Sequence, residues 1–200
     1  MDCRVSLTLI RHLPTLGNQQ RQYIGWTDES IADVGIVNFK LPWEPKNVYG
    51  SDLLRSRESA ALYFPTATYK SDWRLRESHF GEWEGKTYDA LKDNKTYRTW
   101  IDNPYEHTPP DGESLLETET RVLAAVAAFP DEEKDHFVVT HGGPIRLLLT
   151  QFSPRKQDFW SWTIPHGSVW HLEWENVNDF KGGKRCTSLS EVPITGNEHT

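Results

Sequence analysis

The pattern of apolar and polar positions along the chain predicts strands that alternate with helices. Residues 4–10, RVSLTLI, partly alternate in polarity and end apolar, which is typical of a strand. The segment 103–114 is rich in proline and marks a surface loop within an irregular or partly helical stretch. Further strands are expected at 47–52, 66–75, 136–140, 168–175 and 185–192.

Helix signals lie between these strands. The stretch 53–64 is expected to be helical and to stop at Pro65, because proline lacks the backbone donor that a helix needs. A second helix starts with a capping box, Ser114 followed by Glu117, and runs to near residue 129. Further helical segments are expected within 30–40 and after the glycine pair 142–143. Strands that alternate with helices indicate an α/β fold with a largely parallel sheet.

Composition and charge exclude several classes of protein. The net charge is −7 and no run of Lys or Arg occurs, which argues against a nucleic-acid partner. No stretch of 18 apolar residues exists, so no membrane span or membrane partner is expected. Cys3 and Cys186 form no CxxC pair, and the first residues lack the pattern of a signal peptide, so we expect a cytoplasmic protein without disulfides. The oligomeric state is not indicated.

Three of the predicted strands end in residues that suit phosphate chemistry. Because ligands bind outside the carboxyl ends of parallel strands, these residues are expected to form one compact site for a phosphoryl group. Arginine forks match phosphate oxygens, and a helix that starts after a glycine turn adds backbone donors. The residues are Arg11 and His12 after the first strand, Ser51, Asp52 and Arg55 after the second, and Thr140, His141, Gly142 and Gly143 after a later one.

The remaining histidines show no metal-ligand spacing of the HxxxH or HExxH type. We therefore expect neither a metal site nor another cofactor. A small-molecule phosphate ester is the expected partner.

Six sequence blocks resemble the motifs of the histidine phosphatase superfamily, the phosphoglycerate mutase-like proteins, and they occur in the family's order. The resemblance spans residues 7–146 and is closest to the compact phosphatase branch, which includes alpha-ribazole phosphatases and broad-specificity phosphatases. It implies one domain over residues 1–200, a three-layer sandwich with helices on both faces of a mostly parallel central sheet. The blocks are LIRHLPTLGN, YIGWTD, SDLLRSRESA, LRESHFGEWEG, DGES and VVTHGGPIR.

The resemblance also implies roles for individual residues. His12 would be the nucleophile that forms a phosphohistidine, and Glu77 would give a proton to the leaving oxygen. Arg11, Arg55 and His141 would hold the phosphoryl oxygens. Candidate substrate-binding residues are Asn18, Thr15, Arg21, Tyr23 and Gly142. Thr15 is equally expected to stabilise a turn, and Glu113 either to interact with the following helix or to lie at the pocket mouth.

The chain departs from the family pattern after the nucleophile. Leu13 and Pro14 stand where the family usually has glycine followed by another residue, and Ser59 replaces the usual threonine. Leucine adopts a positive φ only with strain, and proline offers no N–H to an anion. Either the loop geometry differs here, or the glycine never needed a special conformation.

Three functions remain open at this point. The first is a metal-independent phosphomonoester hydrolase that acts through a phosphohistidine, with alpha-ribazole phosphate among the candidate substrates. The second is a phosphotransferase of the phosphoglycerate mutase type, and the third is a phosphate-binding protein without turnover. The aromatic residues of segment 159–174 are expected mainly to pack in the core and at its edge. The alternative is that Trp160 or Trp162 contributes to the floor of a pocket for a ring-bearing substrate.

Overall fold

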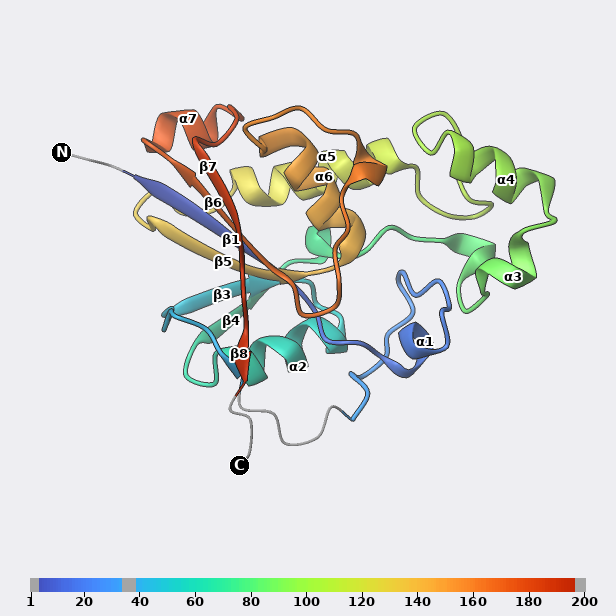
Figure 1. Cartoon of the computed structure of the whole chain (residues 1–200), viewed down its shortest axis with the longest axis horizontal. Coiled ribbons are helices and arrows are strands. Elements are labelled where there is room, and N and C mark those ends of the chain that lie inside the picture. Colours follow the sequence, from blue (N-terminus) through green and yellow to red (C-terminus); the bar gives the residue numbers. More distant parts are fainter. Residues whose placement is uncertain (1–3, 34–38, 197–200) are drawn as a thin grey trace.

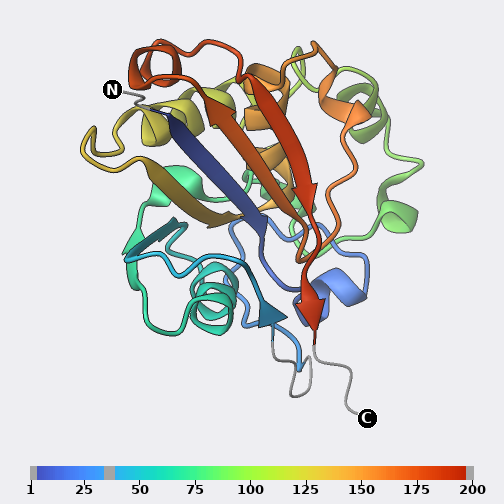
Figure 2. The same cartoon turned by 60° about the vertical axis from the view of Figure 1, so that its left-hand side comes forward.

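The computed structural model describes residues 4–33 and 39–196, and a six-stranded sheet forms its centre. The spatial order is β4-β3-β5-β1-β6-β7, in which the first four strands are parallel and the last two add antiparallel pairs. Figure 2 shows β1, in dark blue, between β5 and β6. The strands are β1 (Val5–Arg11), β3 (Asn47–Gly50), β4 (Thr68–Ser71), β5 (Asp135–Thr140), β6 (Val169–Trp174) and β7 (Ser188–Val192).

Helices cover both faces of this sheet (Figure 1). Leu7 and Leu9 of β1 pack in the core beneath α5 (Leu115–Ala127) and α6 (Gly142–Phe152). Ile10 packs in a second core with residues of α2 (Leu54–Tyr63), on the opposite face. Apolar side chains on both faces of the same strand are typical of a buried parallel sheet. The predicted three-layer α/β fold is confirmed.

A smaller part of the chain lies to one side of the sheet, at the right of Figure 1. It contains α3 (Tyr88–Leu91) and α4 (Lys95–Asp102), and it has an aromatic core of its own around Trp83, Tyr97 and Trp100. We call residues 84–113 the cap. The remaining short elements are α1 (Leu16–Gln19), β2 (Phe39–Lys40), η1 (Trp73–Leu75), η2 (Gly81–Trp83), η3 (Phe159–Ser161), α7 (Val177–Lys181) and β8 (Thr195–Gly196).

The sequence predictions for the six central strands and the three long helices are confirmed by these elements. The helix expected within 30–40 is wrong at both of its described ends, because Ile31 forms an isolated bridge to Thr15 and residues 39–40 form β2, which pairs with β8. Residues 34–38 of that segment and Cys3 lie outside the described residues, whereas Cys186 is buried and free. Among the residues described, no helix has the length and apolar character to cross a bilayer.

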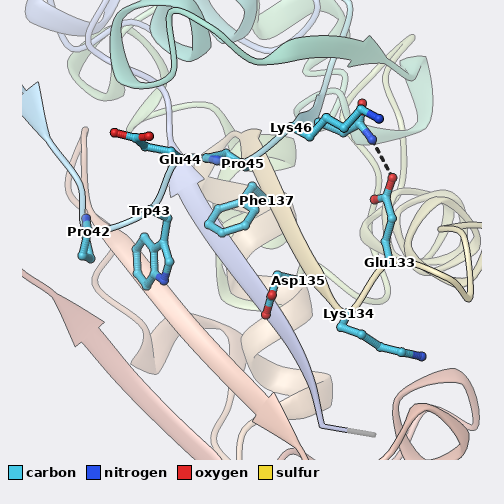
Figure 3. Close-up of a pocket in the computed structure, with 10 residues that line it drawn as sticks. Pro42, Trp43, Glu44, Pro45, Lys46, Glu133, Lys134, Asp135 and Phe137 are labelled. Carbon is cyan, nitrogen blue, oxygen red and sulfur yellow. Dashed lines mark hydrogen bonds between the residues drawn. The ribbon is translucent and has the colours of Figure 1, made fainter.

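A large cavity, about 610 Å³, lies at the amino ends of β3 and β5 (Figure 3). Trp43 and Phe137 line it beside the charged residues Glu133 and Lys134, and Asn47 donates a hydrogen bond of 2.6 Å to Glu133. The opposite, carboxyl ends of the parallel strands carry the residues that the sequence selects. This cavity is therefore separate from the expected site.

The capping box at the start of α5 leads to a prediction about stability. The Ser114 hydroxyl accepts from the backbone N–H of Glu117 at 3.1 Å and donates to its carboxylate at 2.7 Å. Ser114→Ala should lower the free energy of unfolding by about 1 kcal/mol, as measured by urea denaturation. The control is Thr120→Ala in the same helix, which should change it by less than about 0.5 kcal/mol. Equal losses in both variants would contradict the assigned role of the cap.

Candidate active site

His12 directly follows β1 and is buried, with only 3% of its surface exposed. Its Nδ1 lies 2.6 Å from the carbonyl oxygen of Leu13. A carbonyl only accepts, so Nδ1 carries the proton and the lone pair is on Nε2. Burial, together with the positive charges of Arg55 and Arg11, holds the pKa of His12 well below its usual value of 6.5. The ring is therefore uncharged at neutral pH.

His141 directly follows β5 and lies beside His12, with 5.0 Å between the two ring centroids. Arg55 Nε donates to Nδ1 of His141 at 3.3 Å, so in the neutral ring the proton is on Nε2, which donates to Ser51 Oγ at 2.7 Å. Burial, followed by the charge of Arg55, lowers the pKa of His141 well below 6.5. Two uncharged imidazoles thus lie side by side.

Arg55, in the first turn of α2, is fully buried. Besides His141, its guanidinium donates to the carbonyl oxygens of Ile24, Gly25 and Thr27. Glu84 holds the same loop from its other side, because its carboxylate accepts from the backbone N–H groups of residues 25–27. The loop YIGWTD is fixed between a cation and an anion.

Arg11 is the last residue of β1, and its Nη1 donates to the carbonyl oxygen of Ile164 at 2.5 Å. Its Nε–H is buried and has no hydrogen-bond partner among the described residues. Burial lowers the pKa of Arg11 to about 10, which still leaves the guanidinium charged at neutral pH. A buried cationic donor without an acceptor is suited to an anionic oxygen.

Glu77 is buried, and its carboxylate lies at the start of α6. Both carboxylate oxygens accept from the N–H of Gly143, at 3.1 and 3.0 Å, and one accepts from Ser78 at 3.0 Å. A side chain at position 143 would place its Cβ 2.2 Å from a Glu77 oxygen, so the close approach requires glycine. The carbonyl oxygen of Glu77 accepts from Arg121 and from the indole of Trp26, which fixes the backbone of this residue.

Asn18 and Thr15 form a reciprocal cap at the start of α1. The Thr15 hydroxyl accepts from the N–H of Asn18, and the amide oxygen of Asn18 accepts from the N–H of Thr15, each at 3.2 Å. Thr15 therefore stabilises the turn, which is one of its two expected roles. The same amide oxygen lies 3.1 Å from Nε2 of His166, whose ring is 5.2 Å from that of His12.

The other predicted site residues differ in how close they lie to the site. A Cβ at Gly142 would lie 3.4 Å from Cζ of Arg11, so Gly142 borders the site. Tyr23 points to the cap, where its hydroxyl pairs with that of Tyr97 at 2.6 Å. Arg21 is exposed, and its side chain has no hydrogen bond to another described residue. Glu113 pairs with Arg121 at 2.6 Å and accepts from the hydroxyl of Thr118 at 2.9 Å, so it interacts with the helix that follows it, which is one of its two expected roles.

The structure also explains the departure from the family pattern after the nucleophile. The described non-glycine residues with positive φ are Arg21 and Asp111, so Leu13 needs no special conformation. Its N–H donates to the hydroxyl of Ser59 at 2.8 Å, and its side chain packs in the core below α2. Leu13 therefore occupies this position without backbone strain, and Ser59 holds the same loop.

The sequence analysis did not select His166 and Arg146 as site residues. His166 lies in the loop before β6, and burial lowers its pKa to about 3. Arg146 lies one turn into α6, and its charge lies close enough to act on Arg11. The sequence signal for His166 was the tripeptide PHG, in which the structure gives Gly167 a positive φ of 77°. The sequence signal for Arg146 was the arginine at the end of the block VVTHGGPIR.

Metal-ligating side chains do not gather at this site. No group of three or more His, Cys, Asp or Glu residues that could hold a metal ion occurs within residues 4–33 and 39–196. Positive charge in the site comes from the guanidinium groups of Arg11 and Arg55.

Comparisons with known proteins show related sequences and a shared fold. Phosphoglycerate mutase-like protein 4 of Arabidopsis thaliana is 31% identical in an alignment of 204 positions, which covers 84% of this chain and 86% of that protein. The structure of YhfR from Bacillus stearothermophilus matches with a TM-score of 0.72 at 27% identity, covering 90% of this chain and 93% of the other. The alpha-ribazole phosphatase of Shigella flexneri shares the fold, with a TM-score of 0.68 at 20% identity and coverage of 84% and 90%.

The family model of the histidine phosphatase superfamily (branch 1) matches residues 7–180. This range includes all six motif blocks and every residue of the site described above. The prediction from those blocks is confirmed: the chain belongs to the histidine phosphatase superfamily.

Proposed function

We propose that the protein is a metal-independent phosphomonoester hydrolase that forms a phosphohistidine on His12. The observation that carries the proposal is the buried, uncharged imidazole of His12 beside two charged guanidinium groups. The ring supplies a lone pair, and Arg11 and Arg55 supply the positive charge that stabilises the oxygens of a transferring phosphoryl group.

The tautomer of His12 and the position of Glu77 support the following steps. Nε2 of His12 attacks phosphorus, the bond from phosphorus to the ester oxygen breaks, and the leaving oxygen takes a proton from Glu77. Glu77 then accepts a proton from water as the water oxygen attacks phosphorus. The phosphorus–nitrogen bond breaks, inorganic phosphate leaves and His12 is restored. His141 would exchange its partner Ser51 for a phosphoryl oxygen during these steps.

A phosphotransferase of the phosphoglycerate mutase type is the second candidate. It is favoured by the name of the Arabidopsis relative, which is 31% identical to this chain. The two functions share the first step and differ in whether water or a second hydroxyl takes the phosphoryl group from His12. A phosphate-binding protein without turnover is disfavoured, because both His12 and Glu77 are present in the site.

The first prediction about the reaction concerns the nucleophile. Phosphate release from phosphomonoesters should continue in EDTA, and His12→Ala should lower it by roughly 10³-fold or more. The measurement is phosphate release from a panel of alkyl and aryl phosphates, and His107→Ala, in the proline-rich loop, serves as the matched control. Activity that needs a metal, or that survives in the variant, would refute the mechanism. Exchange between 2- and 3-phosphoglycerate without phosphate release would instead identify the mutase.

The second prediction concerns the contact between Gly143 and Glu77. A methyl group at position 143 displaces the Glu77 carboxylate, so Gly143→Ala should lower kcat roughly tenfold to a hundredfold. In a Glu77→Gln background, where no acid remains to be misplaced, the same change should lower kcat less than about twofold. Steady-state kinetics of the double-mutant cycle measure this coupling. Additive effects would show that Gly143 acts independently of Glu77.

The third prediction concerns the charge of the histidines. Because the pKa of His12 and of His141 lies well below 6.5, both rings should stay neutral as the pH falls from 8 to 5.5. Their NMR signals, assigned with His12→Asn, should not shift in this range. In the protein unfolded by urea, all histidines should titrate with a pKa of about 6.5. A midpoint at or above 6.5 for His12 in the folded protein would refute the assignment.

A further inference from the structure

We infer that the substrate carries an aromatic ring on its leaving alcohol and that a cavity beside Glu77 holds this ring. The inference rests on the proposed function, because it takes Glu77 as the group that protonates the leaving oxygen. The cavity has a volume of about 150 Å³, and Glu77, Ser78 and Gly143 form part of its wall. A leaving oxygen within hydrogen-bond reach of Glu77 therefore places the rest of the alcohol inside this cavity.

Aromatic rings enclose the cavity from two sides. Tyr23, Phe80 and Trp100 form the side toward the cap and pack edge to face, with ring centroids 5.1 to 6.2 Å apart. Phe159 and Trp160 form the other side, with their centroids 4.8 Å apart. Aromatic pairs prefer such edge-to-face or offset arrangements, so a further ring between the two sides finds favourable partners on both.

The hydroxyl groups in this wall are already paired. The Tyr23 hydroxyl bonds to that of Tyr97 at 2.6 Å, and the Ser78 hydroxyl bonds to that of Thr118 at 3.0 Å. A sugar or glycerol moiety would lose its water here against a wall of mainly aromatic and apolar side chains, which is unfavourable for buried polar groups. The wall therefore selects against polyol phosphates.

Arg146 is the cationic group of the wall. Its Nε donates to the carbonyl oxygen of Trp162 at 3.0 Å, and its guanidinium carbon lies 5.7 Å from the ring of Phe159 and 5.8 Å from that of Trp160. A guanidinium held among aromatic rings also attracts the face of a bound ring. Because it could equally pair with a carboxylate, the test below includes a substrate that carries one.

The size of the cavity fits one ring. Apolar cavities of about 150 Å³ accommodate benzene. Trp160 is 50% exposed, so the cavity reaches the molecular surface along this residue. Trp162, the other tryptophan that the sequence suggested, is buried in the core and does not line the cavity.

The experiment compares esters of primary alcohols, so that the intrinsic reactivity of the leaving group is matched. The substrates are benzyl phosphate, glycerol 3-phosphate and phosphoserine, of which the last adds a carboxylate. With the full-length protein, kcat/KM for benzyl phosphate should exceed the other two values by about tenfold or more.

Trp160→Ala should lower kcat/KM for benzyl phosphate about tenfold, mainly through a higher KM. The values for the other two esters should change less than about twofold. Trp73→Ala is the matched control, because Trp73 is similarly exposed, 53% against 50%, and does not line the cavity. This control should leave all three values unchanged.

The outcomes separate this inference from the proposed function. Faster turnover of glycerol 3-phosphate or phosphoserine than of benzyl phosphate would overturn the aromatic substrate class and leave the phosphatase intact. Equal losses for all three esters in Trp160→Ala would do the same. No phosphate release from any ester would overturn the proposed function, and this inference with it.

Discussion

The site depends on the burial of one guanidinium group, that of Arg55. Its donors reach His141 and three carbonyl oxygens of the loop that follows Tyr23, so it connects α2, the end of β5 and the entrance to the cap. A buried charge is tolerated only when its hydrogen bonds are made, and the loop carbonyls are satisfied only when the charge is present. The helix α2, the loop 24–27 and His141 therefore form one mutually dependent arrangement.

Two cations beside two uncharged histidines give this arrangement its electrostatic character. The charges of Arg11 and Arg55 favour the neutral form of His12, and the neutral form is the one that carries a lone pair. An anionic ligand at this place would lie beside the guanidinium groups of Arg11 and Arg55 and the uncharged rings of His12 and His141. Together with burial, the same positive charges thus keep His12 uncharged, and they attract anions.

The sequence predicted those parts of the site that follow directly from parallel topology. His12, Arg55 and His141 all come just after strands of the parallel group, whose carboxyl ends meet at one edge. His166 could not be predicted in this way, because it comes before a strand. β6 runs antiparallel to β1, so its beginning lies at the site edge, and alternation of polarity does not reveal strand direction. The helix predicted over residues 39–40 was wrong because these residues form a strand whose partner is more than 150 residues away in the sequence, and a local pattern does not reveal such a pairing.

The leucine after His12 joins the site to the core of the fold. Leu13 packs with Ala60 and Tyr63 below the sheet, and its N–H is bonded to Ser59. Segments that open in local fluctuations have few buried contacts, whereas the loop that contains Leu13 is packed into the core. Amide exchange of the nucleophile loop should then require opening of the core itself. The loop keeps its order for as long as the sheet and α2 remain packed.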